Sequence, residues 1–163
     1  MKMIVAADKN WGIGIEGGLL TPLPEDMRYF REKTKGSVVI MGRKTLESFP
    51  EGKPLKNRVN IVISTSESLT TEGIVKVASV EEAVREAEKY AGREVFVIGG
   101  GTVYRQMLKY CDTAYITKID RVFDNADTFI DNLDMLPEWK IVEMSEVKEY
   151  NGTEFSFVIY KRV

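Results

Sequence analysis

The sequence predicts an α/β fold. We expect one three-layer domain over residues 1–163, with a central mixed, mainly parallel sheet, an antiparallel C-terminal hairpin and about four flanking helices. Three observations support this prediction. Short β-branched runs, several of them apolar throughout, indicate strands that are covered on both faces. Helical patterns alternate with these runs, and Asn151-Gly152 between the last two runs is typical of a hairpin turn.

The expected strands are short runs bounded by glycine, proline or polar residues. In chain order they are Met3–Ala7, Ser37–Met41, Val59–Ser64, Val75–Val77, Val95–Ile98, Thr113–Ile119, Lys140–Val147 and Phe155–Lys161. The fully apolar runs favour the parallel centre of a sheet. The last two runs are expected to pair antiparallel, which makes the sheet mixed at one edge.

The expected helices fall between these runs, at Pro24–Thr34, Lys44–Ser48, Val80–Tyr90 and Gly101–Tyr110. A proline and two acidic residues suit the first turn of the first helix. Ser79, three residues before Glu82, resembles the capping box of the third helix. Three glycines lead from a strand into the fourth.

Composition and charge exclude several classes of protein. With 44% hydrophobic and 29% charged residues, the 163-residue chain can bury a core, which argues against disorder. A net charge of -2 without a basic stripe argues against a nucleic-acid partner. The single cysteine, Cys111, allows no internal disulfide and fits the reducing cytoplasm. We also expect no signal peptide and no membrane contact, because no apolar run approaches the roughly 18 residues of a membrane helix.

The chain contains no histidine. This excludes Ser-His-Asp and Cys-His catalysis and the common zinc sites, and no metal is expected. Acid–base chemistry must therefore come from Asp, Glu, Lys, Tyr or water. No long exposed apolar stripe is evident in the sequence, which favours a monomer.

The segment Gly12–Gly17 matches the GxGxxG fingerprint of dinucleotide-binding folds. That fingerprint requires a helix to begin inside the motif. Here a further glycine and two prolines follow within Gly18–Pro24, and these residues disfavour a helix. We therefore expect a long, mobile loop after the first strand, which could cover a site as a lid.

Two turns have the composition of phosphate-binding sites. Gly42–Thr45 joins a strand to a helix and contains two adjacent cations, although a solvated basic turn explains it equally well. Gly99–Gly101 lets the backbone approach a ligand closely at the start of the next helix. Two such helix starts in one small α/β chain suggest a pyrophosphate-containing ligand.

Asp26 shares one face of the first helix with Met27, Phe30 and Thr34. An acidic residue in a first helical turn usually serves only the helix dipole. A carboxylate beside apolar side chains, however, needs a hydrogen-bonding partner. A ligand with two coplanar N–H donors would suit it.

These motifs occur together, in the order and spacing of one family. Leu23–Asp26 with Phe30, Met41–Phe49 and Ile98–Tyr104 resemble the dihydrofolate reductase family, and the similarity extends from Ile4 to the C-terminal hairpin. The resemblance implies the dihydrofolate reductase fold and the NADPH-dependent reduction of 7,8-dihydrofolate to tetrahydrofolate, which supplies one-carbon carriers. It also implies sensitivity to antifolate inhibitors.

The resemblance implies a substrate site with three parts. Asp26 resembles the carboxylate that binds the pteridine 2-amino group and N3, with Thr117 beside it. Arg58 resembles the arginine that pairs with the α-carboxylate of the substrate's glutamate. The pocket walls implied are Ile4, Val5, Met27, Phe30, Leu55 and Ile98.

The resemblance also implies the cofactor site. Arg43, Lys44, Ser64 and Thr65 match positions around the adenosine 2′-phosphate, which favours NADPH over NADH. Ala6, Ile13 and Tyr104 would lie near the nicotinamide, and the Gly99–Gly100 peptide is cis in the family. The remaining implied cofactor-binding residues are Gly14, Gly42, Thr45, Gly101, Thr102 and Val103.

The chain departs from its family at Thr21, where an aromatic residue is usual. We interpret Thr21 as a residue that holds the water that protonates substrate N5, because Asp26 would lie at the far edge of the pteridine ring. The candidate catalytic residues are Asp26, Thr21, Leu19, Tyr104 and Thr117. Three alternatives stay open: a reductase of a riboflavin precursor, a Rossmann-type dehydrogenase, and a nucleotide-binding regulatory module without catalysis.

Overall fold

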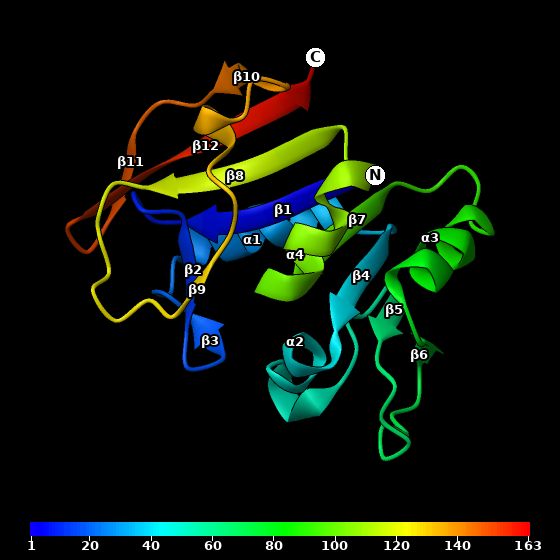
Figure 1. Cartoon of the computed structure of the whole chain (residues 1–163). Coiled ribbons are helices and arrows are strands. Elements are labelled where there is room, and N and C mark those ends of the chain that lie inside the picture. Colours follow the sequence, from blue (N-terminus) through cyan, green and yellow to red (C-terminus); the bar gives the residue numbers. More distant parts are fainter.

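The computed structural model describes residues 1–163. Its main sheet has nine strands in the order β10-β12-β8-β1-β7-β4-β5-β6, with β11 beside β12 (Figure 1). The strands of this sheet are β1 (Lys2–Ala7), β4 (Val38–Gly42), β5 (Val59–Ile63), β6 (Ile74–Val77), β7 (Val95–Gly99), β8 (Thr113–Ile119), β10 (Trp139–Met144), β11 (Lys148–Tyr150) and β12 (Thr153–Arg162). The helices are α1 (Pro24–Thr34), α2 (Arg43–Glu47), α3 (Val80–Glu88) and α4 (Gly101–Met107). Short 3₁₀ turns occupy Pro50–Gly52, Leu108–Tyr110 and Leu133–Met135.

The sheet is mixed, as predicted. The neighbours from β8 to β6 all pair in parallel, whereas β12 is antiparallel to β8, β10 and β11. Between β11 and β12, Asn151 and Gly152 have φ angles of 49° and 81°. Two successive positive φ angles give the tight hairpin turn that Asn-Gly favours.

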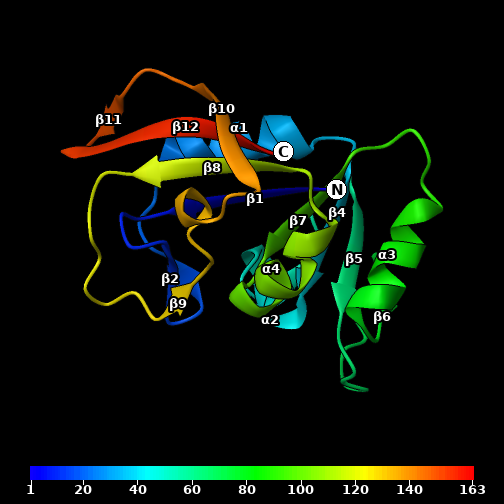
Figure 2. The same ribbon diagram turned by 45° about the horizontal axis from the view of Figure 1, so that its top comes forward.

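Helices cover both faces of the sheet. On β4, Val38 and Ile40 point into the larger core with α3 and α4, while Val39 and Met41 point into a second core. Side chains of α1 and α2 pack against that second core. Figure 2 shows α1 on one side of β8 and β12, and α4 on the other side of the sheet. This three-layer arrangement confirms the predicted fold class.

Most element boundaries agree with the sequence, with three differences. The predicted strand Lys140–Val147 is too long, because β10 ends at Met144, and the short strand β11 that begins at Lys148 was not predicted. The third helix ends at Glu88 and the fourth becomes a 3₁₀ turn after Met107. The Ser79 hydroxyl accepts a 3.1 Å bond from the Glu82 amide, as expected, but the Glu82 carboxylate accepts from the Ala78 amide, one residue before the cap.

The segment after β1 contains two short strands, which the expectation of a long loop did not include. Here β2 (Gly12–Ile15) and β3 (Gly18–Leu19) form a hairpin, and β9 (Thr128–Phe129) completes a small antiparallel sheet in the order β3-β2-β9. The pairing with β9, more than 100 residues later, gives the glycine-rich segment a partner that local sequence does not reveal. No helix begins in the GxGxxG segment, as predicted.

The outer strand β10 exposes apolar side chains, contrary to the expectation that no long apolar stripe is exposed. Ile141, Val142 and Met144 are 42%, 55% and 56% exposed. The pairing with β12 shifts register between Ile141 and Glu143, which is a β-bulge. Bulges interrupt the regular edge that a second strand would need. None of the helices has both the length and the apolar character needed to cross a membrane.

Candidate active site

Asp26 and Thr117 meet across the space between α1 and the sheet. Asp26 lies in the first turn of α1, which begins at Pro24 as the sequence predicts. The Thr117 hydroxyl on β8 donates a 2.5 Å hydrogen bond to Asp26 Oδ1, while Oδ2 has no partner within the chain. Burial raises the pKa of Asp26, although the bond from Thr117 acts in the opposite direction. One oxygen of the Asp26 carboxylate is therefore free to accept hydrogen bonds, at a position from which water is partly excluded.

Four of the six apolar residues expected around Asp26 lie on the same side of the sheet. Ile4 and Ile98 are buried in the core that α1 covers, and Phe30 and Leu55 pack against it. Met27 is 49% exposed, although it is next to Asp26 in the chain. The sheet thus places β1, β7, α1 and the segment before β5 around one apolar cluster.

Arg58 is fixed at the other end of α1. Its Nε donates to the Thr34 hydroxyl at 2.9 Å, and its two terminal nitrogens donate to the Lys56 and Arg31 carbonyls at 2.8 and 3.2 Å. Burial and the nearby Arg31 guanidinium lower the pKa of Arg58. A guanidinium has five N–H donors, so two remain for an anion.

The expected phosphate-binding turns meet at the carboxyl edge of the parallel strands. Met41 of β4 is opposite Gly99 of β7, and Gly42 is opposite Ile63 of β5. In open α/β sheets, ligands bind beyond the carboxyl ends of the strands. Gly42 and Gly100 precede α2 and α4, and neither helix start has a side-chain cap. The Gly99–Gly100 peptide is cis, as the resemblance implies.

Close packing holds these turns together. A Cβ atom at Gly99, which has a φ of 130°, would lie 3.2 Å from the Thr45 hydroxyl, and one at Gly42 would lie 3.3 Å from a Val103 methyl. Arg43 pairs with Glu47 at 2.9 Å. Lys44 is exposed and has no ion-pair partner in the chain, and Thr102 and Thr65 are exposed beside the same turns. The Ser64 hydroxyl accepts a 3.1 Å bond from the Ser66 amide.

The small sheet lies against the start of α4. Ile13 packs on the core that contains Tyr104 and Val103. A Cβ atom at Gly101 would lie 2.6 Å from a Thr128 methyl, so only glycine fits between α4 and β9. The buried Tyr104 hydroxyl donates to the Ile4 carbonyl at 2.7 Å, and burial strongly raises its pKa. Tyr104 is therefore a neutral residue that joins α4 to β1.

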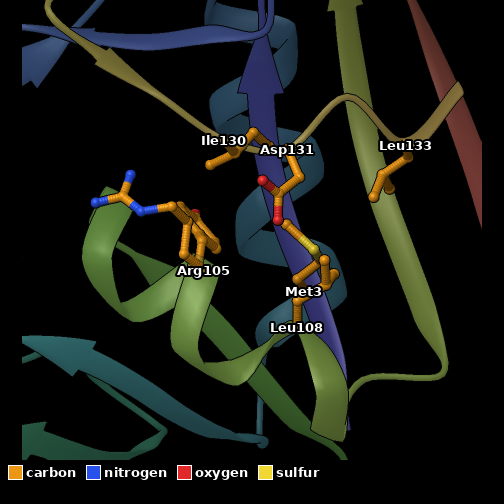
Figure 3. Close-up of a pocket in the computed structure, with 7 residues that line it drawn as sticks. Met3, Arg105, Leu108, Ile130, Asp131 and Leu133 are labelled. Carbon is orange, nitrogen blue, oxygen red and sulfur yellow. The ribbon is translucent and has the colours of Figure 1, made fainter. Parts of the chain in front are cut away.

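A small cavity behind Tyr104 is not a ligand site. Met3, Arg105, Leu108 and Ile130 line it (Figure 3), and its volume is about 10 Å³. Such a space holds at most one water molecule.

Relatives of known function identify the family. The sequence profile described as dihydrofolate reductase matches residues 1–162. The dihydrofolate reductase of Bacillus subtilis is 35% identical over 164 residues, which cover 99% of this chain and 94% of that protein. The chain belongs to the dihydrofolate reductase family. The dihydrofolate reductase of the Buchnera aphidicola strain from Acyrthosiphon pisum is also 35% identical, over 99% of both chains.

A solved member of the dihydrofolate reductase family has the same fold. The structure described as dihydrofolate reductase from Enterococcus faecalis, complexed with NADP(H) and RAB-propyl, superimposes with a TM-score of 0.83. It is 35% identical, and the match covers 99% of this chain and 95% of that one. This similarity confirms the expected fold of the family.

The expected reductase residues differ in how closely the fold brings them together. Asp26 contacts Thr117 directly, whereas Leu19 is 68% exposed on β3. Thr21 is half-buried and its hydroxyl has no hydrogen-bonding partner within the chain. Val5 packs on the larger core and Ala6 on a third cluster around Leu23.

Two connecting residues were missed by sequence reasoning. Thr34 holds Arg58, and its position on the face of Asp26 was the available signal. Asp127 joins the two halves of the small sheet: its Oδ2 accepts from the Glu16 amide at 2.8 Å, and its amide donates to the Gly14 carbonyl at 2.9 Å. No local sequence pattern indicates that long-range contact.

Proposed function

We propose that this chain catalyses the NADPH-dependent reduction of 7,8-dihydrofolate to 5,6,7,8-tetrahydrofolate, with Asp26 binding the pteridine. The observation that supports this most strongly is the half-buried Asp26 carboxylate, with Thr117 on one oxygen and the other oxygen free. Family membership supports the reaction, and the local geometry supports the assignment of Asp26.

In this proposal Asp26 binds two N–H donors of the pteridine, N3 and the 2-amino group. Burial raises the pKa of Asp26, so the ionised form is costly without a partner. Two N–H donors would stabilise the carboxylate, and Thr117 would fix its orientation. Ile4, Phe30 and Leu55 would exclude water from the ring.

The residues at the starts of α2 and α4 also suit NADPH, which when bound supplies the hydride that reduces the C6–N5 bond. The uncapped amides at Gly42–Thr45 and Gly99–Val103 would bind phosphate oxygens. Lys44, without an ion-pair partner, and Arg43 would bind the 2′-phosphate together with Ser64 and Thr65. Ala6, Ile13 and Tyr104 would lie beside the nicotinamide.

The proton for N5 must come from water in this proposal. The Tyr104 hydroxyl already donates to the Ile4 carbonyl, and burial raises its pKa, so it is a poor acid. The unpartnered Thr21 hydroxyl would hold a water molecule under the β2–β3 hairpin. The charge of Asp26 would raise the basicity of the pteridine through its field.

Arg58 would bind the α-carboxylate of the substrate's glutamate. Three of its donors are used within the chain, and a bidentate contact needs two more. Thr34 would act as a positioning residue for this guanidinium.

The deciding experiment measures NADPH oxidation with dihydrofolate added and withheld. We expect oxidation only when dihydrofolate is present, and inhibition by antifolates. NADPH binding without oxidation would favour the regulatory module. Oxidation that requires a riboflavin precursor instead would assign the chain to that second reductase class.

We further propose that residues 1–163 act as one domain and as a monomer in the cytoplasm, without a nucleic-acid partner. The bulge in β10 supports the monomer, because it interrupts the exposed edge of the sheet. Sedimentation equilibrium of the purified chain tests the oligomeric state.

A further inference from the structure

A second cavity lies on the face of the sheet opposite Asp26. Its volume is about 420 Å³, within the range of small-molecule sites. Successive side chains of a strand point to opposite faces, so Lys118 points away from the face on which Thr117 contacts Asp26. In Figure 1, α1 lies behind the sheet at β1, whereas the 3₁₀ turn at Leu133–Met135, which contributes Asp134 to the cavity, lies in front of the sheet.

The charged groups that line this cavity leave one carboxylate free. Lys9 pairs with Asp120 at 3.5 Å, and Lys118 pairs with Asp134 at 2.9 Å. Asp8 accepts three backbone amides, from Asn10, Gly12 and Phe123, and is buried by them. The side chain of Glu154 has no hydrogen bond or ion pair in the chain. The lining therefore has four carboxylates against two ammonium groups.

The opposite wall of the cavity is apolar and exposed. Met144, at the end of β10, and Val147, just before β11, are 56% and 64% exposed. Trp11 lies at the base and is almost fully buried. Exposed apolar side chains that face a hollow gain most when a ligand covers them.

We propose that this cavity binds a small primary amine with an apolar group, the ammonium on Glu154 and the apolar part against Met144 and Val147. The excess negative charge selects a cation, and the apolar wall selects against a bare ammonium ion. The sheet separates this site from the proposed folate site, and none of its lining residues is among those proposed to bind NADPH.

The test uses 2-phenylethylamine as the probe, with the substrate cleft filled by saturating folate and NADP⁺. Amide chemical shifts are followed by ¹H–¹⁵N NMR. We expect saturable shifts at Lys118, Ser145–Val147 and Glu154–Ser156, with a dissociation constant on the order of 1 mM. Phenylacetate, with the opposite charge, and methylamine, without the ring, should each bind roughly tenfold more weakly.

Matched variants separate charge from shape. Glu154→Gln should weaken the probe roughly tenfold, as expected for loss of a charge-assisted hydrogen bond. The double variant Met144→Ser with Val147→Ser should weaken it to the level of methylamine. Glu88→Gln, an exposed carboxylate on α3, is the control and should leave binding unchanged.

Three results would overturn the proposal. The first is equal binding of phenylacetate and 2-phenylethylamine. The second is a set of shifts centred on Asp26 and Leu55 that disappears when folate fills the cleft. The third is the absence of saturable shifts at Glu154–Ser156 while the protein remains folded, as judged by its dispersed NMR spectrum.

Discussion

At the scale of single residues, Asp26 is proposed to bind the substrate, and its burial also lowers the stability of the folded protein when the carboxylate is ionised. We predict that Asp26→Asn retains the fold and lowers turnover roughly 10²–10³-fold at neutral pH, because an amide presents a donor where the pteridine also presents one. Steady-state rates with dihydrofolate check this, with Asp131→Asn, an exposed residue, as control. Near-normal turnover would contradict the assignment of Asp26.

The same variant should be more stable than the wild type as pH rises. Folding raises the pKa of Asp26, so the folded state retains the proton that the unfolded state releases. The wild type therefore loses stability as pH rises from the unfolded pKa, about 3.9, through the folded one. Urea unfolding of both proteins across this window should show a difference that grows with pH and then levels off.

Thr21 is a residue at which we expect the chain to differ from its family. If its free hydroxyl holds the proton-donating water, Thr21→Val should lower turnover by about tenfold to a hundredfold above neutral pH, where protonation limits the rate. Valine has nearly the shape of threonine but no hydroxyl. Thr21→Ser should restore much of the rate, and a Thr21→Val pH profile that overlays the wild type would exclude the water role.

Residues that would bind a ligand were easier to predict than residues whose role is to hold another side chain in place. Asp26 and Thr117 were predicted from motif resemblance, and the structure joins them by a hydrogen bond. The bond between Thr34 and Arg58 was not predicted, because it joins residues 24 positions apart that belong to different elements. Such pairs depend on how α1 packs, which no local pattern specifies.

At the scale of elements, the C-terminal end of α1 holds Arg58 toward the proposed glutamate site. Thr34→Val removes the hydroxyl that accepts from Arg58 Nε. We predict a rise of about fivefold in the KM for dihydrofolate with kcat nearly unchanged, since one hydrogen bond to a charged group is lost. A pteridine substrate without the glutamate tail should show no change, and an equal change for both substrates would show that Thr34 only stabilises α1.

Arg43 and Lys44, at the start of α2, are proposed to make the chain bind NADPH in preference to NADH. Replacing both Arg43 and Lys44 with alanine should weaken NADPH at least tenfold and NADH little, because charge-assisted bonds to the 2′-phosphate are lost. Fluorescence titration with each cofactor measures this, with Lys35→Ala as a control for net charge. Equal losses for the two cofactors would show that the pair does not bind that phosphate.

Elements were predicted best where local chemistry determines their ends. The limits of α1 agree with the prediction because Pro24 and two acidic residues favour its first turn. The strand at Lys140–Val147 was predicted too long and β11 was not predicted, because the alternation of side chains hides the bulge near Val142 and the break before Lys148. A bulge depends on pairing with the neighbouring strand, which the residues alone do not show.

At the scale of the whole molecule, the β3-β2-β9 sheet depends on contacts between residues more than 100 positions apart. The amides of Glu16 and Asp127 and the carboxylate of Asp127 join β2 to the segment before β9. The sequence could not predict this sheet, because β9 is two residues long and its partner segment matches a different motif. The main sheet, whose runs are longer and more apolar, could be predicted from periodicity.

We predict that Asp127→Ala loosens this small sheet while the main sheet stays intact. The Glu16 amide loses its acceptor, so hydrogen exchange should accelerate at Gly14–Glu16 and remain unchanged in β4 and β7. If the hairpin covers the reacting atoms, kcat should fall while the urea midpoint changes little. Asp124→Ala, an exposed neighbour without a side-chain partner, is the control.

The pH dependence of exchange identifies the bond responsible. The Glu16 amide and the Thr128 hydroxyl lower the pKa of Asp127, so its contribution is fully present above the unfolded value of about 3.9 and is lost as pH falls through the folded pKa. Protection of the Glu16 amide, corrected for intrinsic exchange, should therefore be constant near neutral pH and fall only in acid. In Asp127→Ala the acid-dependent step should disappear. If it persists, another acidic group holds β2 against β9, and Asp127 only shapes the turn before β9.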